Sequence, residues 1–173
     1  MNTNFNPIKP EQITENPFVL LNDDWMLITA GTPDKFNTMT ASWGGMGVLW
    51  NKRVVYIFIR PPRYTYDFVE NSSIFTLSFF NNDYRKALRI CGETSGRDTD
   101  KIKATGLTPL FSNDYIAFEE AKLIFQCRKI YFNDILSENF LDPKIQPHYP
   151  NNDYHRMYVG EIEQVLTKKM AEK

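Results

Sequence analysis

The sequence lacks the features that would assign it to several large classes of protein. Its 173 residues carry a formal net charge of −1, so no bulk attraction to nucleic acid or to an anionic membrane is expected. Cys91 and Cys127 are far apart and form no CxxC spacing, which favours free thiols in a reducing compartment. The "GGMG" at 44–47 is not a GxGxxG loop and precedes no predicted helix, so a Rossmann cofactor site is not expected.

Targeting segments are also missing. The opening "MNTNFNPIKPEQ" has neither the basic nor the apolar part of a secretory signal. No apolar run approaches the roughly 18 residues that a membrane span requires. We therefore expect a soluble, cytoplasmic protein that binds neither membrane nor nucleic acid.

Residues that would carry acid/base or metal chemistry are scarce. His148 and His155 lie near no cysteine in the sequence, so a zinc site is not expected. No Ser-His-Asp order, activated nucleophile or acid/base pair is recognisable, and no catalytic residue is predicted. If the chain is an enzyme, a cofactor must supply the chemistry.

Aromatic residues, in contrast, are plentiful. They make up 14% of the chain, with nine tyrosines and thirteen phenylalanines, which suits β structure or a stacking ligand site. A hydrophobic content of 42% is enough for one domain with a substantial core. We predict a single domain over 1–173, with an N-terminal lead-in over 1–16 and a polar tail over 168–173.

Alternating hydrophobicity predicts several strands. In "WMLITAGT", for example, Met26 and Ile28 face one way and Leu27 the other. The predicted strands are 25–32, 36–45, 54–61, 73–80, 119–136 and 155–168. The predicted helical segments are 10–21, interrupted at Pro17, and 64–72, 83–93 and 97–106, the last ending at Gly106.

The order of these elements shows no regular β-α-β-α alternation, and 138–154 reads as an irregular loop containing prolines. A doubly wound parallel sheet is therefore not expected. The pattern favours a mainly β fold, an antiparallel β-barrel with helical insertions.

The segment "RPPRYTYDFVEN" is a candidate anion site. Two prolines end a buried strand, and Arg63 precedes a predicted helix start. An arginine, a hydroxyl and the free amides of a helix N-terminus together form a phosphate cradle. The alternative is that Thr65 is an ordinary N-cap and Arg63 a surface charge.

The segment "TSGRDTDK" is a second, weaker candidate. Arg97 and Lys101 are four residues apart and would share a helix face if the helix started early enough, adding positive charge to an anion site. The alternative is a capped helix whose Asp98 and Asp100 interact with the helix dipole.

The segment "FNTMTASWGG" has the small and hydroxylated side chains of a strand that a flat ring can approach. Its hydroxyls and amides would bond the edge of a heterocycle, and Trp43 would pack near it. The alternative is a strand with a polar outer face and a glycine bulge.

Five motifs occur along the chain in the order "NTMTASWGG", "RPPRYTYDFVEN", "YRKAL", "SGRDTDKIKATGLTP" and "YHRMYVGEIEQVL". Together they resemble the flavin reductase-like family, especially its flavoredoxin-like branch. The resemblance covers about residues 25–167. It implies an FMN-binding split β-barrel, usually a homodimer with the flavin near the subunit interface. It also implies that the site residues match the family's motifs: Thr38, Met39, Thr40, Ala41, Ser42 and Trp43 along the ring and ribityl chain, Arg63 and Thr65 at the phosphate with Tyr66 nearby, and Ser95, Gly96, Arg97 and Lys101 closing the site.

His155 matches the family's histidine before the last strand, in a structural role or near the ring. Many relatives have an isoleucine-glycine pair where this chain has Ala41 and Ser42, so Ser42 is either a hydroxyl for the flavin or a tolerated small residue. Some members of the family reduce free flavin with NADH or NADPH, and others pass electrons between protein partners. The preferred hypothesis is an FMN-dependent oxidoreductase that passes hydride or electrons from NAD(P)H to an acceptor. The alternatives are an electron carrier fed by a redox protein, without its own nicotinamide site, and a binding module that has lost its cofactor.

Overall fold

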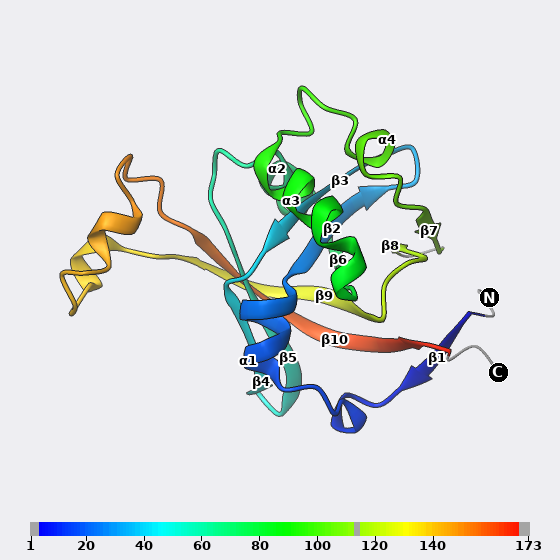
Figure 1. The fold of residues 1–173 in the computed structure, drawn as a ribbon. Coiled ribbons are helices and arrows are strands. Elements are labelled where there is room, and N and C mark those ends of the chain that lie inside the picture. The colour runs from blue at the N-terminus through cyan, green and yellow to red at the C-terminus, as the bar shows by residue number, and fades with distance from the viewer. Residues whose placement is uncertain (1–3, 113–114, 170–173) are drawn as a thin grey trace.

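The computed structural model describes residues 4–112 and 115–169, and antiparallel strands form most of this part of the chain (Figure 1). The strands are β1 (Phe5–Ile8), β2 (Met26–Thr32), β3 (Lys35–Ala41), β4 (Gly44–Leu49), β5 (Lys52–Ile59), β6 (Ile74–Phe79), β7 (Pro109–Phe111), β8 (Ile116–Phe118), β9 (Leu123–Asp134) and β10 (Arg156–Lys168). All described strand pairs are antiparallel, which confirms the predicted mainly β class.

One eight-stranded sheet curls into an open barrel. Its strand order is β3-β2-β6-β9-β10-β5-β4, with β1 added beside β10, while β7 and β8 form a separate pair. β3 and β4 therefore lie at the two ends of the order although only Ser42 and Trp43 separate them in sequence. The barrel is split where the chain passes from one edge strand to the other.

This split corrects the prediction of one strand over 36–45. β3 ends at Ala41, and Gly44 begins a new strand that pairs with β5. No bulge lies at the two glycines. Gly44 instead permits close approach, because a Cβ there would lie 2.8 Å from the carbonyl oxygen of Tyr56.

Helical segments lie between the strands of the sheet. They are η1 (Pro10–Gln12), α1 (Pro17–Val19), η2 (Leu20–Asp24), α2 (Tyr64–Asn71), η3 (Asn82–Tyr84), α3 (Arg85–Glu93), α4 (Lys101–Thr105), η4 (Ser137–Asn139) and η5 (Gln146–His148). No helix in the described ranges is both long and apolar enough to cross a membrane.

Two helix starts differ from the predictions. Pro17 does not interrupt a helix but begins one, because the Asn16 side chain caps the amide of Phe18 and proline suits a first turn. The helix predicted over 97–106 begins only at Lys101, since Asp100 is its N-cap and accepts from the amide of Lys103. Its predicted end at Gly106 is confirmed by a left-handed φ of 71°.

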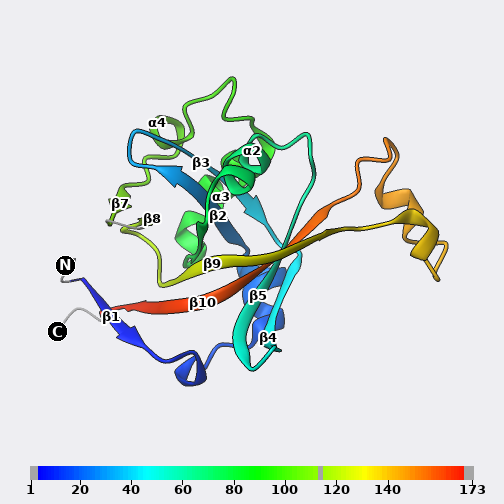
Figure 2. The same cartoon turned by 180° about the vertical axis from the view of Figure 1, so that it is seen from behind.

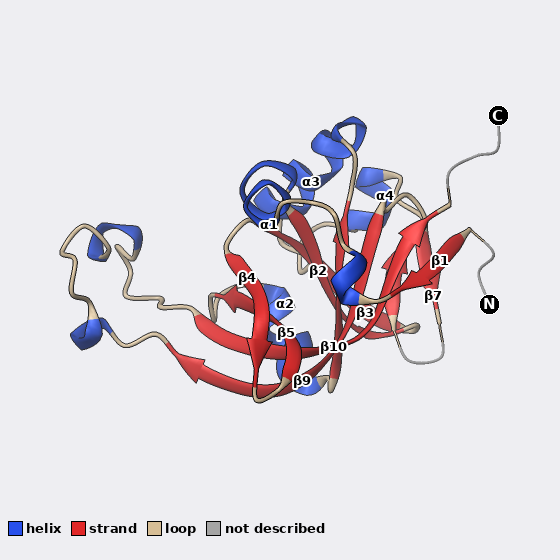
Figure 3. Ribbon diagram, turned by 90° about the horizontal axis from the view of Figure 1, so that it is seen from below, coloured by secondary structure: helices blue, strands red, loops and turns tan. Residues whose placement is uncertain are grey.

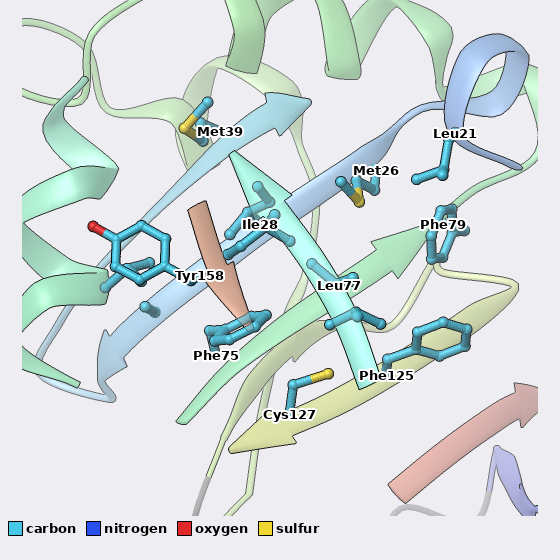
Figure 4. Close-up of a cluster of buried hydrophobic side chains, with 14 of the residues drawn as sticks. Leu21, Met26, Ile28, Met39, Phe75, Leu77, Phe79, Phe125, Cys127 and Tyr158 are labelled. Atoms are coloured by element: carbon cyan, nitrogen blue, oxygen red, sulfur yellow. The ribbon is translucent and has the colours of Figure 1, made fainter. Parts of the chain in front are cut away.

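The barrel interior holds the larger hydrophobic cluster (Figure 4). Met26 and Ile28 of β2 and Met39 of β3 meet Phe75 and Leu77 of β6 there. Leu27, on the opposite face of β2, belongs to a second cluster beneath α3. β2 is thus buried on both faces. The alternation predicted from the sequence requires burial of one face only.

The strands β9 and β10 continue beyond the barrel as an arm that carries the irregular loop 135–155 (Figures 1 and 2). The same arm projects in the perpendicular view of Figure 3. Three apolar side chains on it are exposed: Leu136 by 46%, Leu141 by 97% and Ile145 by 37%. The arm therefore presents apolar surface that the barrel does not cover.

β1 lies beside the last residues of β10 (Figures 1 and 2). β1, inside the predicted lead-in, pairs with β10, so this segment is part of the sheet. Of the predicted tail, Lys168 ends β10 and the amide of Lys169 donates to Asn4, while 170–173 lie outside the described residues.

Candidate functional site

A small polar cavity lies where α2 begins, against the start of β3 and the loop after α3. Its volume is about 140 Å³. We call it the cradle, and its lining residues are Asn37, Pro62, Arg63, Tyr64, Thr65, Glu93, Thr94, Ser95, Gly96 and Lys101. Five of the residues predicted from sequence to bind the cofactor thus line one cavity.

Lys101 is the buried cation of the cradle, with 5% of its surface exposed. Its Nζ donates to the carbonyl oxygens of Thr38, at 2.7 Å, and Cys91, at 2.9 Å, and it forms no ion pair in the described part of the chain. Burial lowers the pKa of Lys101 to about 8, against an opposing interaction with Cys91 and with a smaller lowering from the charge of Arg63. A buried ammonium held only by carbonyls leaves charge for an anion to balance.

Arg63 is the second cation of the cradle. It occupies the N-cap position of α2 with an extended backbone, and its half-buried guanidinium makes no hydrogen bond or ion pair to any described residue. Burial, and secondarily the charge of Arg60, lowers the pKa of Arg63. Its donors are free for a phosphate oxygen, and the first amides of α2 lie beside it.

Thr65 does not cap α2, which corrects the simpler alternative from sequence. It is the second residue of the helix, buried, and its hydroxyl oxygen accepts from Nδ2 of Asn37 at 2.8 Å. The hydroxyl keeps its own hydrogen for a further acceptor.

The loop after α3 closes the cradle through Gly96. A Cβ at Gly96 would lie 2.1 Å from Oδ1 of Asn37, so only glycine fits against this amide. Ser95 begins the tight turn that follows, with its hydroxyl accepting from the amide of Arg97 at 3.1 Å. The loop thereby fixes one wall of the cavity.

Arg97 does not line the cradle. Its guanidinium donates to Asp67 at 2.8 Å and to the carbonyl of Pro62 at 3.1 Å, and it lies 4.6 Å from the ring centre of Tyr64. Because α4 starts at Lys101, Arg97 and Lys101 share no helix face. Arg97 ties the loop to α2.

The hydroxyls of β3 are already bonded within the protein. Thr38 contacts the hydroxyl of Thr29 at 2.9 Å and donates to the carbonyl of Ile28. Thr40 donates to the carbonyl of Leu88 in α3 at 2.5 Å. Neither side chain is directed to a ligand, so the hydroxyls hold β3 against β2 and α3.

The backbone of β3, unlike its hydroxyls, directs hydrogen-bonding groups to the open edge of the strand. The carbonyl of Thr38 points away from β2, because it accepts from Lys101, and in an antiparallel pair every second residue points the same way. Thr40 therefore directs its amide and carbonyl to the same open edge. The side chains of Met39 and Ala41 face the barrel core instead.

A second hollow, of about 410 Å³, lies where β3 gives way to β4. We call it the apolar hollow, and its lining residues are Phe18, Leu21, Asn22, Ser42, Trp43, Gly44, Phe58 and Ile135. No lining residue carries a charge. Ser42 and Trp43, both predicted site residues, form its wall at the split of the barrel.

His155 connects the apolar hollow to the arm. Its ring lies 5.2 Å from that of Trp43, and its Nδ1 contacts the hydroxyl of Tyr149 at 2.9 Å. Burial lowers the pKa of His155 to about 4, reinforced by the charge of Arg60 and opposed by Asp153. The imidazole is therefore neutral near pH 7.

Tyr66 faces away from both cavities. Its ring lies 6.4 Å from that of Tyr158, inside the barrel wall, and 5.7 Å from the guanidinium of Arg156. Burial, followed by the charge of Glu70, raises the pKa of Tyr66. It packs the inner side of α2 rather than lining the cradle.

Sequence reasoning missed Asn37 and Tyr64. Asn37 joins β3 to α2 and contacts Gly96, and Tyr64 lines the cradle beside it. The available signal was position: Asn37 precedes the hydroxylated run, and Tyr64 separates Arg63 from Thr65.

The structure is thus an open antiparallel β-barrel with a cationic cavity at a helix N-terminus. The family described as "Flavin reductase like domain" matches residues 21–173. The chain therefore belongs to the flavin reductase-like domain family, which confirms the resemblance seen in the sequence motifs.

Solved structures share the fold. An FMN-binding domain of a flavin reductases-like enzyme from Shewanella baltica is 16% identical, with a TM-score of 0.70 over 95% of this chain and 78% of that one. Flavoredoxin from Desulfovibrio vulgaris is 20% identical, with a TM-score of 0.66 over 94% and 76%. The NADH:FAD oxidoreductase SgcE6 of Streptomyces globisporus is 15% identical, with a TM-score of 0.62 over 87% and 77%. A search of curated protein sequences gave no significant match.

Proposed function

We propose that this protein is an FMN-binding oxidoreductase of the flavin reductase type. The observation that carries the proposal is a pair of cations, Arg63 and Lys101, that line one cavity without a carboxylate partner in the described residues. Their donors, with the α2 amides and the Thr65 hydroxyl, fit a phosphate monoester.

Backbone groups along the open edge of β3 would hold the remainder of the cofactor. Asn37 lines the cradle and Ser42 the apolar hollow, and the five residue steps from one to the other span about 17 Å. The Thr40 backbone faces this edge midway. Its amide would bond the rim of the isoalloxazine ring, near the split at Ser42 and Trp43.

Bound flavin supplies hydride and electron transfer, and the protein supplies position and electrostatics. The cradle holds the phosphate, while backbone groups of β3 orient the ring and tune its potential. Arg97 fixes the 94–99 loop to α2, and Gly96 lets that loop reach Asn37. His155 stays neutral and positions Trp43.

The proposed electron source is NAD(P)H, with hydride passing through FMN to an acceptor. A carrier function without a nicotinamide site is the second candidate, and one observation favours it. The apolar hollow beside the ring position has no cation in its lining to meet the phosphates of a dinucleotide. Both kinds of protein occur among the structural neighbours, as flavoredoxins and as an NADH:FAD oxidoreductase.

We also propose a homodimer. The arm over 135–155 carries Leu136, Leu141 and Ile145 as exposed apolar side chains, and it starts beside His155 and the apolar hollow. A second copy packed on this arm would bury them and shield the flavin.

The first test is the colour of the purified protein and its reduction without oxygen. Loss of the flavin absorbance on adding NADH or NADPH supports the reductase. Reduction only by dithionite or a ferredoxin-type donor supports the carrier. Colourless protein that takes up no added FMN rules out both.

A matched pair of variants tests the phosphate site. Arg63→Ala is expected to weaken FMN binding by roughly 10- to 150-fold, the loss of one charge-assisted bond of about 1.5–3 kcal/mol. Arg53→Ala removes the same charge from an exposed residue of β5 that pairs with Glu11 and does not line the cradle, and it is expected to change the affinity far less. Equal losses in both variants would show a general charge effect and reject the assigned role of Arg63.

A further inference from the structure

We propose that Lys101 is a modification site: the cofactor-free cradle binds acyl phosphates, the mixed anhydrides of a carboxylic acid and phosphoric acid, and Lys101 accepts their acyl group. Lys101 of α4 and Arg63 at the start of α2 line the same cavity of about 140 Å³. That acylation blocks FMN binding rests on the proposed function, whereas the acylation itself depends only on this cavity.

Two backbone acceptors fix the nitrogen of Lys101. Its Nζ lies 2.7 Å from the carbonyl oxygen of Thr38 and 2.9 Å from that of Cys91. A neutral amine has two hydrogens and one lone pair, so these two carbonyls can accept both hydrogens. No other partner of Nζ is found among the residues that the structure describes. The lone pair is therefore available to an electrophile in the cavity that Lys101 lines.

Burial keeps a large share of this amine neutral. Only 5% of Lys101 is exposed, and burial lowers its pKa to about 8, with the Cys91 thiol raising it and the charge of Arg63 lowering it further. At pH 8 about half of the chains therefore carry the nucleophilic amine, whereas an ordinary exposed lysine has under about 1% in that form. An unprotonated, desolvated lysine is an activated nucleophile.

Arg63 supplies the recognition of the phosphate. Its guanidinium makes no hydrogen bond or ion pair to any described residue, so its donors are free for phosphate oxygens. Glu93 is the one carboxylate among the described lining residues, and it is exposed. In an acyl phosphate a single oxygen separates the acyl carbon from the phosphorus. A phosphate held by Arg63 therefore brings that carbon into the same small cavity as Nζ of Lys101.

The transfer balances without a further reagent. The Nζ lone pair attacks the acyl carbon, a carbon–nitrogen bond forms, and the bond from that carbon to the bridging oxygen breaks. The electron pair of the broken bond leaves with the phosphate, which takes up the proton that the nitrogen releases, while Arg63 offsets its charge. The products are an acylated lysine and inorganic phosphate. The lysine loses its charge, and its amide nitrogen keeps one hydrogen for two carbonyls.

Acetyl phosphate and N-acetoxysuccinimide form a matched pair of probes, since both transfer an acetyl group and only the first carries a phosphate. The full-length, cofactor-free chain is treated with each at pH 8, and peptide mass spectrometry measures the rates. Acetyl phosphate is expected to modify Lys101 at least about tenfold faster than Lys103, an exposed lysine of the same helix. With N-acetoxysuccinimide the ratio of these two rates is expected to be about tenfold smaller.

Competition and a matched pair of arginines locate the site. Inorganic phosphate and FMN are each expected to slow acetylation of Lys101 by acetyl phosphate and to leave Lys103 unchanged. Arg63→Ala is expected to slow Lys101 by about tenfold, the loss of one charge-assisted bond. Arg53→Ala removes an exposed charge of β5 that pairs with Glu11, and it is expected to have no effect. The competition needs no variant, so it decides the matter even if Arg63→Ala fails to fold.

Three results would overturn the proposal. Acetylation of Lys101 no faster than of Lys103 would show that the nitrogen is not open to the reagent. An equal rate ratio with both acetyl donors would show a reactive amine without phosphate recognition. A rate at Lys101 that inorganic phosphate does not lower would place the binding of acetyl phosphate outside the cradle.

The flavin proposal fails separately. A chain that takes up no FMN, but whose Lys101 is acetylated in competition with inorganic phosphate, keeps this site and loses the proposed function. A chain that binds FMN and whose Lys101 stays unmodified after removal of the flavin does the reverse. If both proposals hold, the acetylated chain is expected to bind FMN at least about tenfold more weakly.

Discussion

The cradle and the apolar hollow lie toward opposite ends of the open edge of β3 and differ in the properties that select a ligand. The cradle is small and lined by two cations, one of them buried. The apolar hollow is about three times larger and has no charged lining residue. β3 thus connects a cavity lined by two cations to a hollow lined by uncharged residues.

The comparison shows how little of a strand's chemistry has to come from its side chains. The Thr38 and Thr40 hydroxyls bind neighbouring elements of the protein, and Met39 and Ala41 fill the core. What β3 presents at its edge is backbone, which is why small and hydroxylated residues suit it. The selectivity lies at its two ends.

The largest expected effect concerns the neutral histidine beside the hollow. The pKa of His155 is lowered to about 4 in the folded chain, against about 6.5 when unfolded, so the unfolded state binds more protons between these values. Stability is therefore lost as the pH falls from about 6.5 to 4, by up to about 3 kcal/mol. Urea unfolding at pH 7 and pH 4.5 measures this loss.

His155→Gln supplies the control, because an amide does not titrate while it retains hydrogen-bonding groups. The variant is expected to lose less stability on acidification than the parent chain. If the variant and the parent chain lose the same stability on acidification, a group other than His155 causes the loss. The hollow would then no longer be distinguished by a neutral histidine.

The buried cation of the cradle gives the next effect. Lys101→Met is expected to weaken FMN binding by about 1.5–3 kcal/mol, as one charge-assisted bond is removed. The same substitution relieves a buried charge, so the free energy of unfolding of the cofactor-free chain should stay equal or rise. Binding titrations and urea unfolding would show these opposite signs.

If the Lys101→Met variant instead unfolds more easily than the parent chain, the two hydrogen bonds from Nζ to carbonyl oxygens stabilise the fold. In that case the lysine belongs to the scaffold, and the cradle would depend on Arg63 alone.

The pH dependence of FMN binding separates the two cavities further. Because the pKa of Lys101 is about 8 in the free chain, its charge is lost as the pH rises through that value. The surrounding charged groups are Arg63, Glu93 and Asp100, with the Cys91 thiol also in contact. Affinity for FMN is expected to fall by up to about tenfold per pH unit above 8.

Riboflavin, which lacks the phosphate, is the control for this experiment. Its affinity should not fall over the same pH range. A parallel decline for FMN and riboflavin would point to a general loss of structure rather than to the cradle.

The smallest expected effect is at the middle of the strand. Thr40→Val removes a hydroxyl that bonds the carbonyl of Leu88, at a cost of about 1 kcal/mol in the free energy of unfolding. FMN affinity should be unchanged, because only the backbone of Thr40 faces the open edge. A clear loss of FMN affinity without loss of stability would instead place the hydroxyl on the ligand.

The motifs predicted the family, the antiparallel fold and much of the cradle, because short-range rules govern those features. The double proline and Arg63 predict a helix start at α2, and alternation predicts β2. The separation of Arg97 from Lys101 was not predictable. It depends on Asp67 of α2, which accepts from Arg97, and on Asp100, which caps α4 one turn later than the sequence pattern predicted.

By itself, the sequence determined which residue types are available: uncharged aromatics near the split, cations near a helix start, and small residues in "FNTMTASWGG". Only the tertiary structure decided which atoms of that segment are free. The side chains on the two faces of β3 contact α3 and the barrel core, so they are not available to a ligand. The open edge exists because β3 ends the strand order, and that order is set by pairings between strands far apart in the chain.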